Sequence, residues 1–201
     1  MRIYLVRHGE TVLNCRKCYY GFTDASLNEN GIKQAESLRS FFSAMDFDYI
    51  ISSPLKRAAD TARIVTGAEA EEITFDERLM EQNFGIFEGH TCEELLSKYP
   101  AEFDAWNRDF SDYRIDGGES FRDVRNRVED FTASLPTGRG SILLAAHKGT
   151  LGHLMAALLK MPLEGYWNFV FEQGCYSCVD VEDGYAIVRK LNQSVPAGEE
   201  K

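Results

Sequence analysis

Residues 3–11 of this 201-residue chain read IYLVRHGET, an apolar and β-prone run that stops abruptly at Arg7, His8 and Gly9. A short continuous apolar run is typical of a buried strand in a parallel sheet. In open α/β sheets, ligands bind in the crevice at the carboxyl ends of the strands. Gly9 lacks a side chain at a point where another group can approach the backbone closely. The stretch therefore predicts a buried strand that delivers a guanidinium and an imidazole to a binding crevice.

Two further segments have the same form. Residues 141–147 read SILLAAH, a second apolar run that ends in a histidine, His147. Residues 49–57 read YIISSPLKR, a strand followed by a helix start that carries Arg57 in its first turn. Because the chain has only four histidines, packing alone is a poor explanation for two of them at strand ends. Two guanidiniums and two imidazoles suit a phosphate dianion, since arginine binds its oxygens bidentately and neutral imidazole can attack phosphorus.

The alternation of strands and helices predicts a three-layer α/β/α sandwich with a mostly parallel central sheet. Expected strands are 3–7, 47–51, 72–75 and 141–147, followed by a hairpin of 176–181 and 185–191. Expected helices begin at Asn28 and Pro54 and span 119–135 and 150–159, with helical pieces broken at Pro100 between 91 and 110. We expect one domain over 1–192, with a small cap-like insertion at about 77–120 and a polar tail at 193–201.

An ordered set of motifs around these residues resembles the signature of the histidine phosphatase superfamily, the phosphoglycerate-mutase-like proteins. The set extends over roughly residues 1–190 and comprises RHGET at 7–11 with Asn14, GFTD at 21–24, Leu27, GIKQA at 31–35, SSP at 52–54, Arg57, Ala58, Thr61, Ala62, LME at 79–81, GIFEG at 85–89, GES at 118–120 and His147. A single Arg-His-Gly triplet would mean little, whereas the complete ordered set has a low risk of a false match.

The resemblance assigns a role to each residue of the site. It implies that His8 is the nucleophile, whose ring nitrogen attacks phosphorus to form a phosphohistidine. It implies that Arg7, Arg57 and His147 bind the substrate phosphate and neutralise the charge on its oxygens, while Asn14 adds a neutral donor. A second interpretation of His147 stays open, because a residue that only positions His8 would give the same sequence.

Glu81 is the candidate general acid, which would protonate the leaving alkoxide and then deprotonate the attacking water. The residues alone do not select it over Glu10, Glu77 and Glu88. Its position in the LME motif at 79–81 resembles that of the proton donor of the family. We expect Glu10 and Glu88 to be structural partners of backbone or arginine groups.

The pocket that selects the substrate is expected to lie at loop positions 15–23 and 82–120, and the candidate pocket residues are Tyr20, Gly21 and Lys148. Many phosphatases of this family carry glycine at the position of Lys148, and many relatives carry arginine at the position of Gly152. Lys148 can either reach a second anionic group of the substrate or point to solvent, and both interpretations stay open.

Hydrolysis is favoured over two alternative functions. The glycolytic mutases of this family carry Glu-Arg-His-Tyr at the acid position and a paired Arg-Arg downstream, whereas residues 81–84 read EQNF here and no Arg-Arg pair occurs. Residues 83–89 look most like α-ribazole-phosphatase-type and broad small-molecule phosphatases. We therefore expect metal-independent hydrolysis of small phosphomonoesters without a cofactor, because arginine and histidine perform the task of Mg²⁺. The alternatives are mutase-type phosphoryl transfer and a non-catalytic domain for binding a phospho-ligand.

Charge and composition limit the partners. The net charge is −10 and the pI is near 4.9, which argues against nucleic acid and anionic membranes as partners. No signal peptide or membrane span is recognisable, so a cytoplasmic location is expected. The expected partner is a small-molecule substrate, and the expected oligomeric state is a monomer or homodimer. The odd number of cysteines, five, fits reduced thiols. The CxxC pairs at 15–18 and 175–178 are expected to be structural thiols rather than halves of a zinc site.

Overall fold

The computed structural model describes residues 1–195 and contains a six-stranded sheet. In spatial order the strands are β4 (Ile73–Phe75), β3 (Tyr49–Ser52), β6 (Ser141–Ala146), β1 (Arg2–Arg7), β7 (Cys175–Glu182) and β8 (Tyr185–Ser194). The first four are parallel, and β7 and β8 are antiparallel to their neighbours. This mixed but mostly parallel sheet confirms the predicted architecture.

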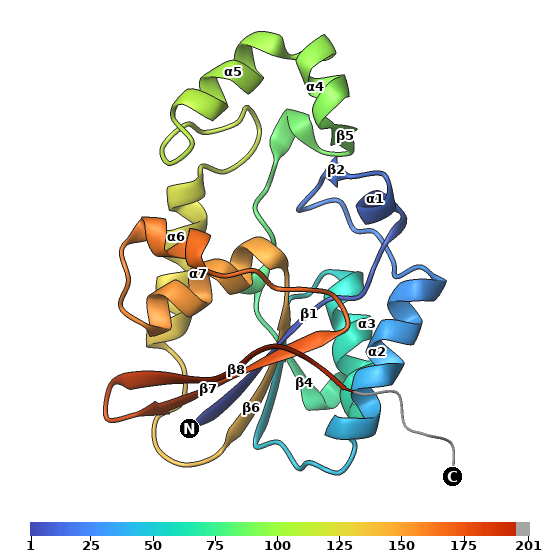
Figure 1. Cartoon of the computed structure of the whole chain (residues 1–201), viewed down its shortest axis with the longest axis vertical. Coiled ribbons are helices and arrows are strands. Elements are labelled where there is room, and N and C mark those ends of the chain that lie inside the picture. Colours follow the sequence, from blue (N-terminus) through green and yellow to red (C-terminus); the bar gives the residue numbers. More distant parts are fainter. Residues whose placement is uncertain (196–201) are drawn as a thin grey trace.

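Helices cover both faces of the sheet (Figure 1). The four large ones are α2 (Glu29–Phe42), α3 (Lys56–Thr66), α6 (Phe121–Ala133) and α7 (Lys148–Leu158). The alternation along β1 separates two cores: Ile3 and Leu5 pack with α6 and α7, whereas Tyr4 and Val6 pack with α2 and α3. Successive side chains of a strand point to opposite faces, so β1 reads as one continuous apolar run because both of its faces are buried.

Local sequence signals set the helix ends. The Asn28 side chain accepts the N–H of Gly31 at 2.8 Å and begins α2. Gly67, with a φ of +76°, ends α3 in the left-handed conformation that favours glycine. Helix α6 begins after Ser120, whose N–H is accepted by the Asp123 carboxylate at 2.8 Å in a capping box. It therefore starts two residues later than the predicted Glu119.

A small cap lies above the carboxyl ends of the strands (Figure 1). Its elements are β2 (Cys18–Tyr19), β5 (His90–Thr91), α4 (Cys92–Lys98) and α5 (Pro100–Arg108). The cap has a hydrophobic cluster of its own, formed by Phe87, Leu95, Phe103, Trp106 and Ile115. The two helices meet at Pro100, where the sequence predicted a break. Residues 14–24, expected to be a loop, instead contain part of the short helix α1 (Val12–Cys15) and all of β2.

The remaining differences from expectation are at element ends. Helix α7 begins at Lys148 rather than Thr150, which places Lys148 and Gly149 in its first turn. Strand β8 extends to Ser194, into the segment assigned to a polar tail, and residues 196–201 of that tail lie outside the described residues. Across residues 1–195, no helix has both the length and the apolar character that crossing a membrane requires.

Candidate active site

The strand register brings the two histidines together. Strands β1 and β6 are parallel neighbours in which Arg7 pairs with Ala146, so His8 and His147 leave the sheet side by side. The His8 N–H donates to the Ala146 carbonyl at 3.0 Å, and the two ring centroids are 5.1 Å apart. The predicted meeting of two strand-end histidines is therefore present in the fold. The close approach expected at Gly9 is made by the protein itself, because a Cβ there would lie 2.3 Å from the Gly31 carbonyl oxygen.

The position of the ring proton of His8 is fixed by the backbone carbonyl of the next residue, Gly9. His8 is 4% exposed, and its Nδ1 lies 2.7 Å from the carbonyl oxygen of Gly9. A carbonyl can only accept, so Nδ1 carries the hydrogen and Nε2 carries the lone pair. Burial, followed by the positive charges of Arg57 and Arg7, holds the pKa of His8 well below 6.5. His8 is thus a neutral imidazole with Nε2 as its nucleophilic atom.

Arg57 is fully buried at the start of α3 and is held by three acceptors. Its Nη2 donates to the Gly21 carbonyl at 2.7 Å and its Nη1 to the Thr23 carbonyl at 2.9 Å. Its Nε donates to Nδ1 of His147 at 3.2 Å. Since a guanidinium has five N–H bonds, this leaves donors for a further acceptor. The Tyr20 ring lies 4.7 Å from the guanidinium carbon and adds a cation–π contact.

Both ring nitrogens of His147 have protein partners. Nδ1 accepts from Arg57, so the hydrogen of the neutral ring is on Nε2, which lies 2.8 Å from the Ser53 hydroxyl. Burial and the charge of Arg57 hold the pKa of His147 well below 6.5. His147 is fully buried behind His8 and does not line the cavity. In this arrangement it orients Arg57, and a direct contact with phosphate would require the Ser53 contact to open.

Arg7 and Asn14 both face the cavity with hydrogen-bonding capacity to spare. The Nη1 of Arg7 donates to the Phe171 carbonyl at 2.9 Å, while its buried Nε has no partner within residues 1–195. The Oδ1 of Asn14 accepts from Tyr20 and from Gln173, each at 2.9 Å. Because the amide oxygen is occupied, the amide nitrogen of Asn14 is the group left for a ligand, in line with its expected role as a neutral donor.

Glu81 lines the cavity at the start of α7. Its two carboxylate oxygens accept the N–H groups of Gly149 at 2.9 Å and of Gln82 at 3.0 Å. Helix N-termini favour negative charge, so this position suits a carboxylate. A Cβ at Gly149 would lie 2.3 Å from Glu81 Oε1, so only glycine allows the contact without displacement. Of the rival carboxylates named from sequence, none lines this cavity.

The rival carboxylates have structural partners. Glu88 accepts the backbone N–H groups of Gly21, Phe22, Thr23 and Phe84 at 2.8–3.1 Å. It thereby ties the loop below Arg57 to the cap, as expected for a partner of backbone groups. Glu10 also has a structural role, but its partners are the side-chain amides of Asn28 and Asn30 at 2.9 and 3.2 Å rather than backbone or arginine groups.

Sequence reasoning missed the residue that holds the Glu81 segment in place. Arg127 of α6 donates to the carbonyl oxygens of Arg78 and Met80, both at 2.7 Å, and of Glu81 at 3.0 Å. Its Nε also pairs with the Glu119 carboxylate at 2.9 Å. The apolar positions of this helix follow a regular period, and this pattern alone places Arg127 on the solvent-facing side. The GES motif at 118–120 was the available signal, since it supplies the partner carboxylate.

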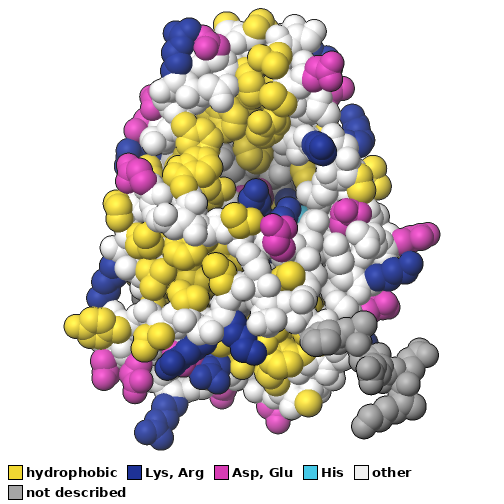
Figure 2. All heavy atoms as spheres, viewed as in Figure 1, with side chains coloured by type: hydrophobic (Ala, Val, Ile, Leu, Met, Phe, Trp, Pro, Cys, Tyr) yellow, Lys and Arg dark blue, Asp and Glu magenta, His cyan; other side chains and the backbone are white. Residues whose placement is uncertain are grey.

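The cavity over these residues has a volume of about 480 Å³ and two chemical parts. Its floor carries the arginines and His8, and in Figure 2 dark blue and magenta side chains lie within a hollow bordered by hydrophobic groups. The other part, which we call the aromatic compartment, is lined by Trp106, Phe110, Phe121, Tyr166 and Trp167. This compartment is bordered by the cap and by the 3₁₀ segment Leu163–Asn168.

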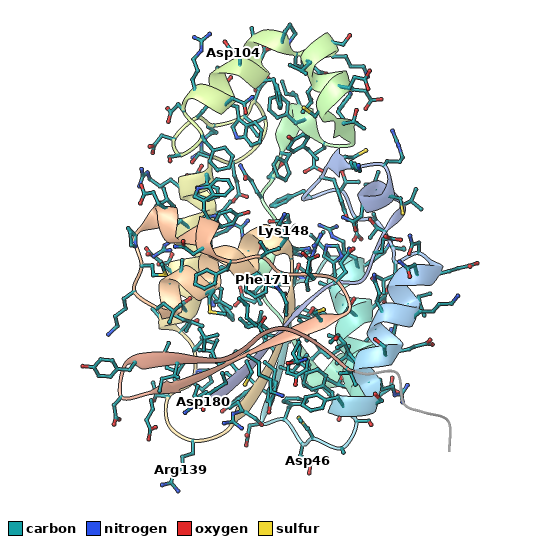
Figure 3. All side chains as sticks on the ribbon, in the orientation of Figure 1. Asp46, Asp104, Arg139, Lys148, Phe171 and Asp180 are labelled. Atoms are coloured by element: carbon teal, nitrogen blue, oxygen red, sulfur yellow. The ribbon has the colours of Figure 1, made fainter. Side chains whose placement is uncertain are left out.

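The three candidate pocket residues occupy different places. Tyr20 lines the cavity and is 7% exposed. Lys148 lines the cavity but is exposed to solvent, and Figure 3 shows it between the sheet and the cap. Gly21 lies behind the cavity, where its carbonyl holds Arg57 and a Cβ would lie 1.6 Å from the Gln82 carbonyl oxygen. Gly21 therefore shapes the site through Arg57 and the backbone of the cap.

No metal site is formed by the cysteines or other ligands of residues 1–195. No group of three or more His, Cys, Asp or Glu side chains in that range could hold a metal ion. All five cysteines are free thiols. Cys178 is buried in the core beneath α2, whereas Cys175 is partly exposed. The polar groups with hydrogen-bonding capacity to spare at the cavity are instead guanidinium and amide donors.

Comparison with known proteins gives full-length matches. A family model described as the histidine phosphatase superfamily, branch 1, matches residues 3–194. Adenosylcobalamin/alpha-ribazole phosphatase of Escherichia coli (strain K12) is 34% identical over 194 residues, which are 96% of either chain. Phosphoserine phosphatase 1 of Hydrogenobacter thermophilus is 32% identical and covers 99% of this chain and 95% of its own. The crystal structure of the alpha-ribazole phosphatase from Shigella flexneri has a TM-score of 0.91 at 33% identity, over 98% of this chain and all of that one.

Proposed function

This chain belongs to the histidine phosphatase superfamily, and we propose that it hydrolyses small phosphomonoesters through a phosphohistidine on His8. The observation that carries the proposal is the state of His8, a neutral ring with its Nε2 lone pair beside Arg7 and Arg57. A neutral imidazole flanked by two cations can attack a phosphate dianion whose charge those cations neutralise.

In the first step Nε2 of His8 forms a bond to phosphorus as the bond to the ester oxygen breaks. Arg7, Arg57 and the Asn14 amide nitrogen donate to the equatorial oxygens, where charge accumulates in the transition state. Glu81 in its protonated form gives its proton to the leaving oxygen. The products are an alcohol, a phosphohistidine and the Glu81 carboxylate.

In the second step water attacks the phosphohistidine. The Glu81 carboxylate accepts a proton from that water, the bond between Nε2 and phosphorus breaks, and inorganic phosphate leaves. This restores the protonated Glu81 and the neutral His8. In the proposal no metal ion is needed, because guanidinium donors hold the transferred group throughout.

The aromatic compartment favours an alcohol that carries a flat ring. The named relatives include an adenosylcobalamin/alpha-ribazole phosphatase and a phosphoserine phosphatase. Phosphoserine would bring an ammonium and a carboxylate into a space lined mainly by aromatic side chains. Stacking on aromatic rings suits a ring-bearing alcohol better, since paired aromatics prefer offset or edge contacts at 4.5–7 Å.

Phosphate release measured on wild type and His8→Ala, without added metal and with excess chelator, tests the proposal. Wild type should turn over benzyl phosphate, and His8→Ala should lose at least about a thousandfold in kcat, because the nucleophile is absent. Acid-quenched wild type should carry an acid-labile phosphoryl group on His8. Transfer of phosphate between two hydroxyls of glycerate without net release would instead indicate a mutase, and binding without labelling would indicate a non-catalytic domain.

The variant Glu81→Gln tests the general-acid role of Glu81 separately from the nucleophilic role of His8. The loss in kcat should be large for benzyl phosphate and small for p-nitrophenyl phosphate, whose leaving group needs no proton. A general acid typically contributes about 10²- to 10⁴-fold, so the difference between the two substrates should lie in that range. Equal losses for both would remove Glu81 from the proposed role.

A further inference from the structure

His153 is a buried polar residue of the aromatic compartment that the mechanism does not use. It lies on α7, is 1% exposed and borders the cavity. Its ring contacts Phe121, at 4.2 Å between centroids, and Tyr166, at 4.9 Å, and these two rings also contact each other at 4.7 Å. The flanking helix positions Leu151, Leu154 and Met155 are buried apolar residues, so His153 is an exception on that helix.

The ring of His153 has unused hydrogen-bonding capacity. Its Nδ1 is buried and has no partner within residues 1–195. Three of the four such atoms in that range belong to residues that line this one cavity: Arg7 Nε, Trp106 Nε1 and His153 Nδ1. Buried polar groups are nearly always hydrogen-bonded, so a cluster of exceptions around a cavity indicates that a ligand supplies the partners. In the proposed function the substrate phosphate supplies the partner of Arg7 Nε. Trp106 and His153 instead line the aromatic compartment, which would hold the leaving alcohol.

The imidazole stays neutral throughout the physiological range. Burial, followed by the charges of Arg125 and Arg127, lowers the pKa of His153 to about 3. A neutral imidazole has one donor and one acceptor, so it can pair with a ring nitrogen, a hydroxyl or an amino group of a ligand. It is therefore suited to recognising a neutral polar atom and not to binding a second anion.

Gly152 explains why the ring of Tyr166 lies beside His153. A Cβ at Gly152 would lie 2.7 Å from the Tyr166 ring, so a larger residue there would move Tyr166 off the helix. Glycine at this position of α7 leaves room for the Tyr166 ring against the helix. The compartment thus contains aromatic faces and, at its wall, the imidazole of His153 and the indole N–H of Trp106.

We propose that His153 determines specificity by hydrogen-bonding to the leaving alcohol, which is a flat aromatic alcohol with a polar ring atom. This inference rests on the proposed phosphatase function and adds the substrate class. In the complex, the ring of the alcohol stacks within the aromatic compartment and its polar atom pairs with the imidazole. An alcohol of the same shape without that atom leaves His153 without a partner and is processed less efficiently.

Benzyl phosphate and its three pyridylmethyl analogues test this inference, because they differ only in the presence and position of one ring nitrogen. For wild type, kcat/KM should be about three- to tenfold higher for at least one pyridylmethyl phosphate than for benzyl phosphate, as expected from one net hydrogen bond. The gain should be mainly in KM, because the contact is remote from the reacting atoms.

The matched variant is His153→Phe, which keeps a ring against Phe121 and Tyr166 but removes the hydrogen bond. It should retain kcat/KM for benzyl phosphate within about twofold and lose the preference for the pyridylmethyl ester. His153→Asn, which restores a donor and an acceptor, should recover part of the preference. Equal rates for all four esters in wild type, or a preference that survives in His153→Phe, would overturn the inference. Absence of hydrolysis for every ester would instead refute the phosphatase function.

Discussion

A single backbone oxygen decides which nitrogen of His8 is nucleophilic. The Gly9 carbonyl accepts from Nδ1, and burial with two neighbouring guanidiniums lowers the pKa of the ring. We therefore expect His8 to be protonated on Nδ1 alone at every pH from about 8 to 5.5, whereas an ordinary histidine titrates near 6.5. Nitrogen-detected NMR of the imidazoles measures this directly. A titration of His8 with a midpoint near 6.5 would contradict the assignment.

A substitution at Gly149 is expected to impair catalysis, because Gly149 contacts Glu81, the proposed general acid. Adding one methyl group in Gly149→Ala places a carbon where Glu81 Oε1 now lies, so the carboxylate has to move. A displacement of about 1 Å in a catalytic group can cost about a hundredfold in rate. We expect kcat for benzyl phosphate to fall by about that factor, while p-nitrophenyl phosphate is affected far less because it needs no acid. Similar losses on both substrates would indicate general misfolding instead.

The site residues differ in how far sequence alone could place them. His8, Arg7 and Arg57 follow from strand ends and a helix start, because parallel strands place their carboxyl ends at one edge. Glu81 required the family motif, since its segment has no periodic structure. Arg127 had only an indirect signal, the GES motif that supplies its partner Glu119, because its contact with Met80 is distant in sequence. His153 could not be singled out, because it lies within a regular helix and its role depends on packing against another element, as with Tyr166.

At the scale of elements, Arg127 of helix α6 holds the backbone of the segment that carries Glu81, the proposed general acid. Arg127→Met removes three donors to carbonyl groups and the partner of Glu119, but keeps an unbranched apolar stem. We expect kcat for benzyl phosphate to fall by about 10- to 100-fold through misplacement of Glu81, with a smaller loss for p-nitrophenyl phosphate. Within residues 1–195, the Glu119 carboxylate then keeps only the Asn83 N–H as a partner, so the free energy of unfolding should also fall by about 1–3 kcal/mol.

Glu119→Gln is the control for that variant, since it removes the charge pair while leaving Arg127 free to hold the three carbonyls. It should lower stability but keep the ratio of the two substrates near the wild-type value. If Arg127→Met changes neither the ratio nor kcat, helix α6 supports the fold and does not position the acid. Steady-state kinetics on the two substrates and urea unfolding of both variants measure these quantities.

Elements defined by local sequence were predicted well, and elements defined by distant pairing were not. The cap at Asn28 predicted the start of α2 correctly, because that signal lies within a few residues of the helix. Strand β2 exists only because Cys18 pairs with Thr91 across more than seventy intervening positions. No window of local sequence contains that pairing. The cap therefore appeared from sequence as an irregular loop and two helical pieces.

Across the whole molecule, three buried histidines are kept neutral, and this couples folding to pH. The pKa values of His8, His147 and His153 are all lowered in the folded state, that of His153 to about 3. In the unfolded chain these side chains titrate near 6.5, so the unfolded state binds protons first as the pH falls. The contribution of these histidines to the free energy of unfolding is therefore fully present above about pH 7. It decreases as the pH falls below about 6.5, and the decrease continues until the pH reaches the lowered folded-state pKa values.

The slope of the free energy of unfolding against pH indicates how many of the three histidines stay neutral in the folded state. An imidazole that binds a proton only in the unfolded state contributes at most about 1.4 kcal/mol per pH unit, so the free energy of unfolding should fall by at most about 4 kcal/mol per unit between roughly pH 6 and 5, a window above most carboxylate titration. Urea unfolding at a series of pH values measures the slope. His153→Phe should reduce the slope by about one third, because one proton fewer is taken up on unfolding. An unchanged stability between pH 7 and 5 would mean that these imidazoles accept protons in the folded enzyme, and the proposed nucleophile would then be charged at mildly acidic pH.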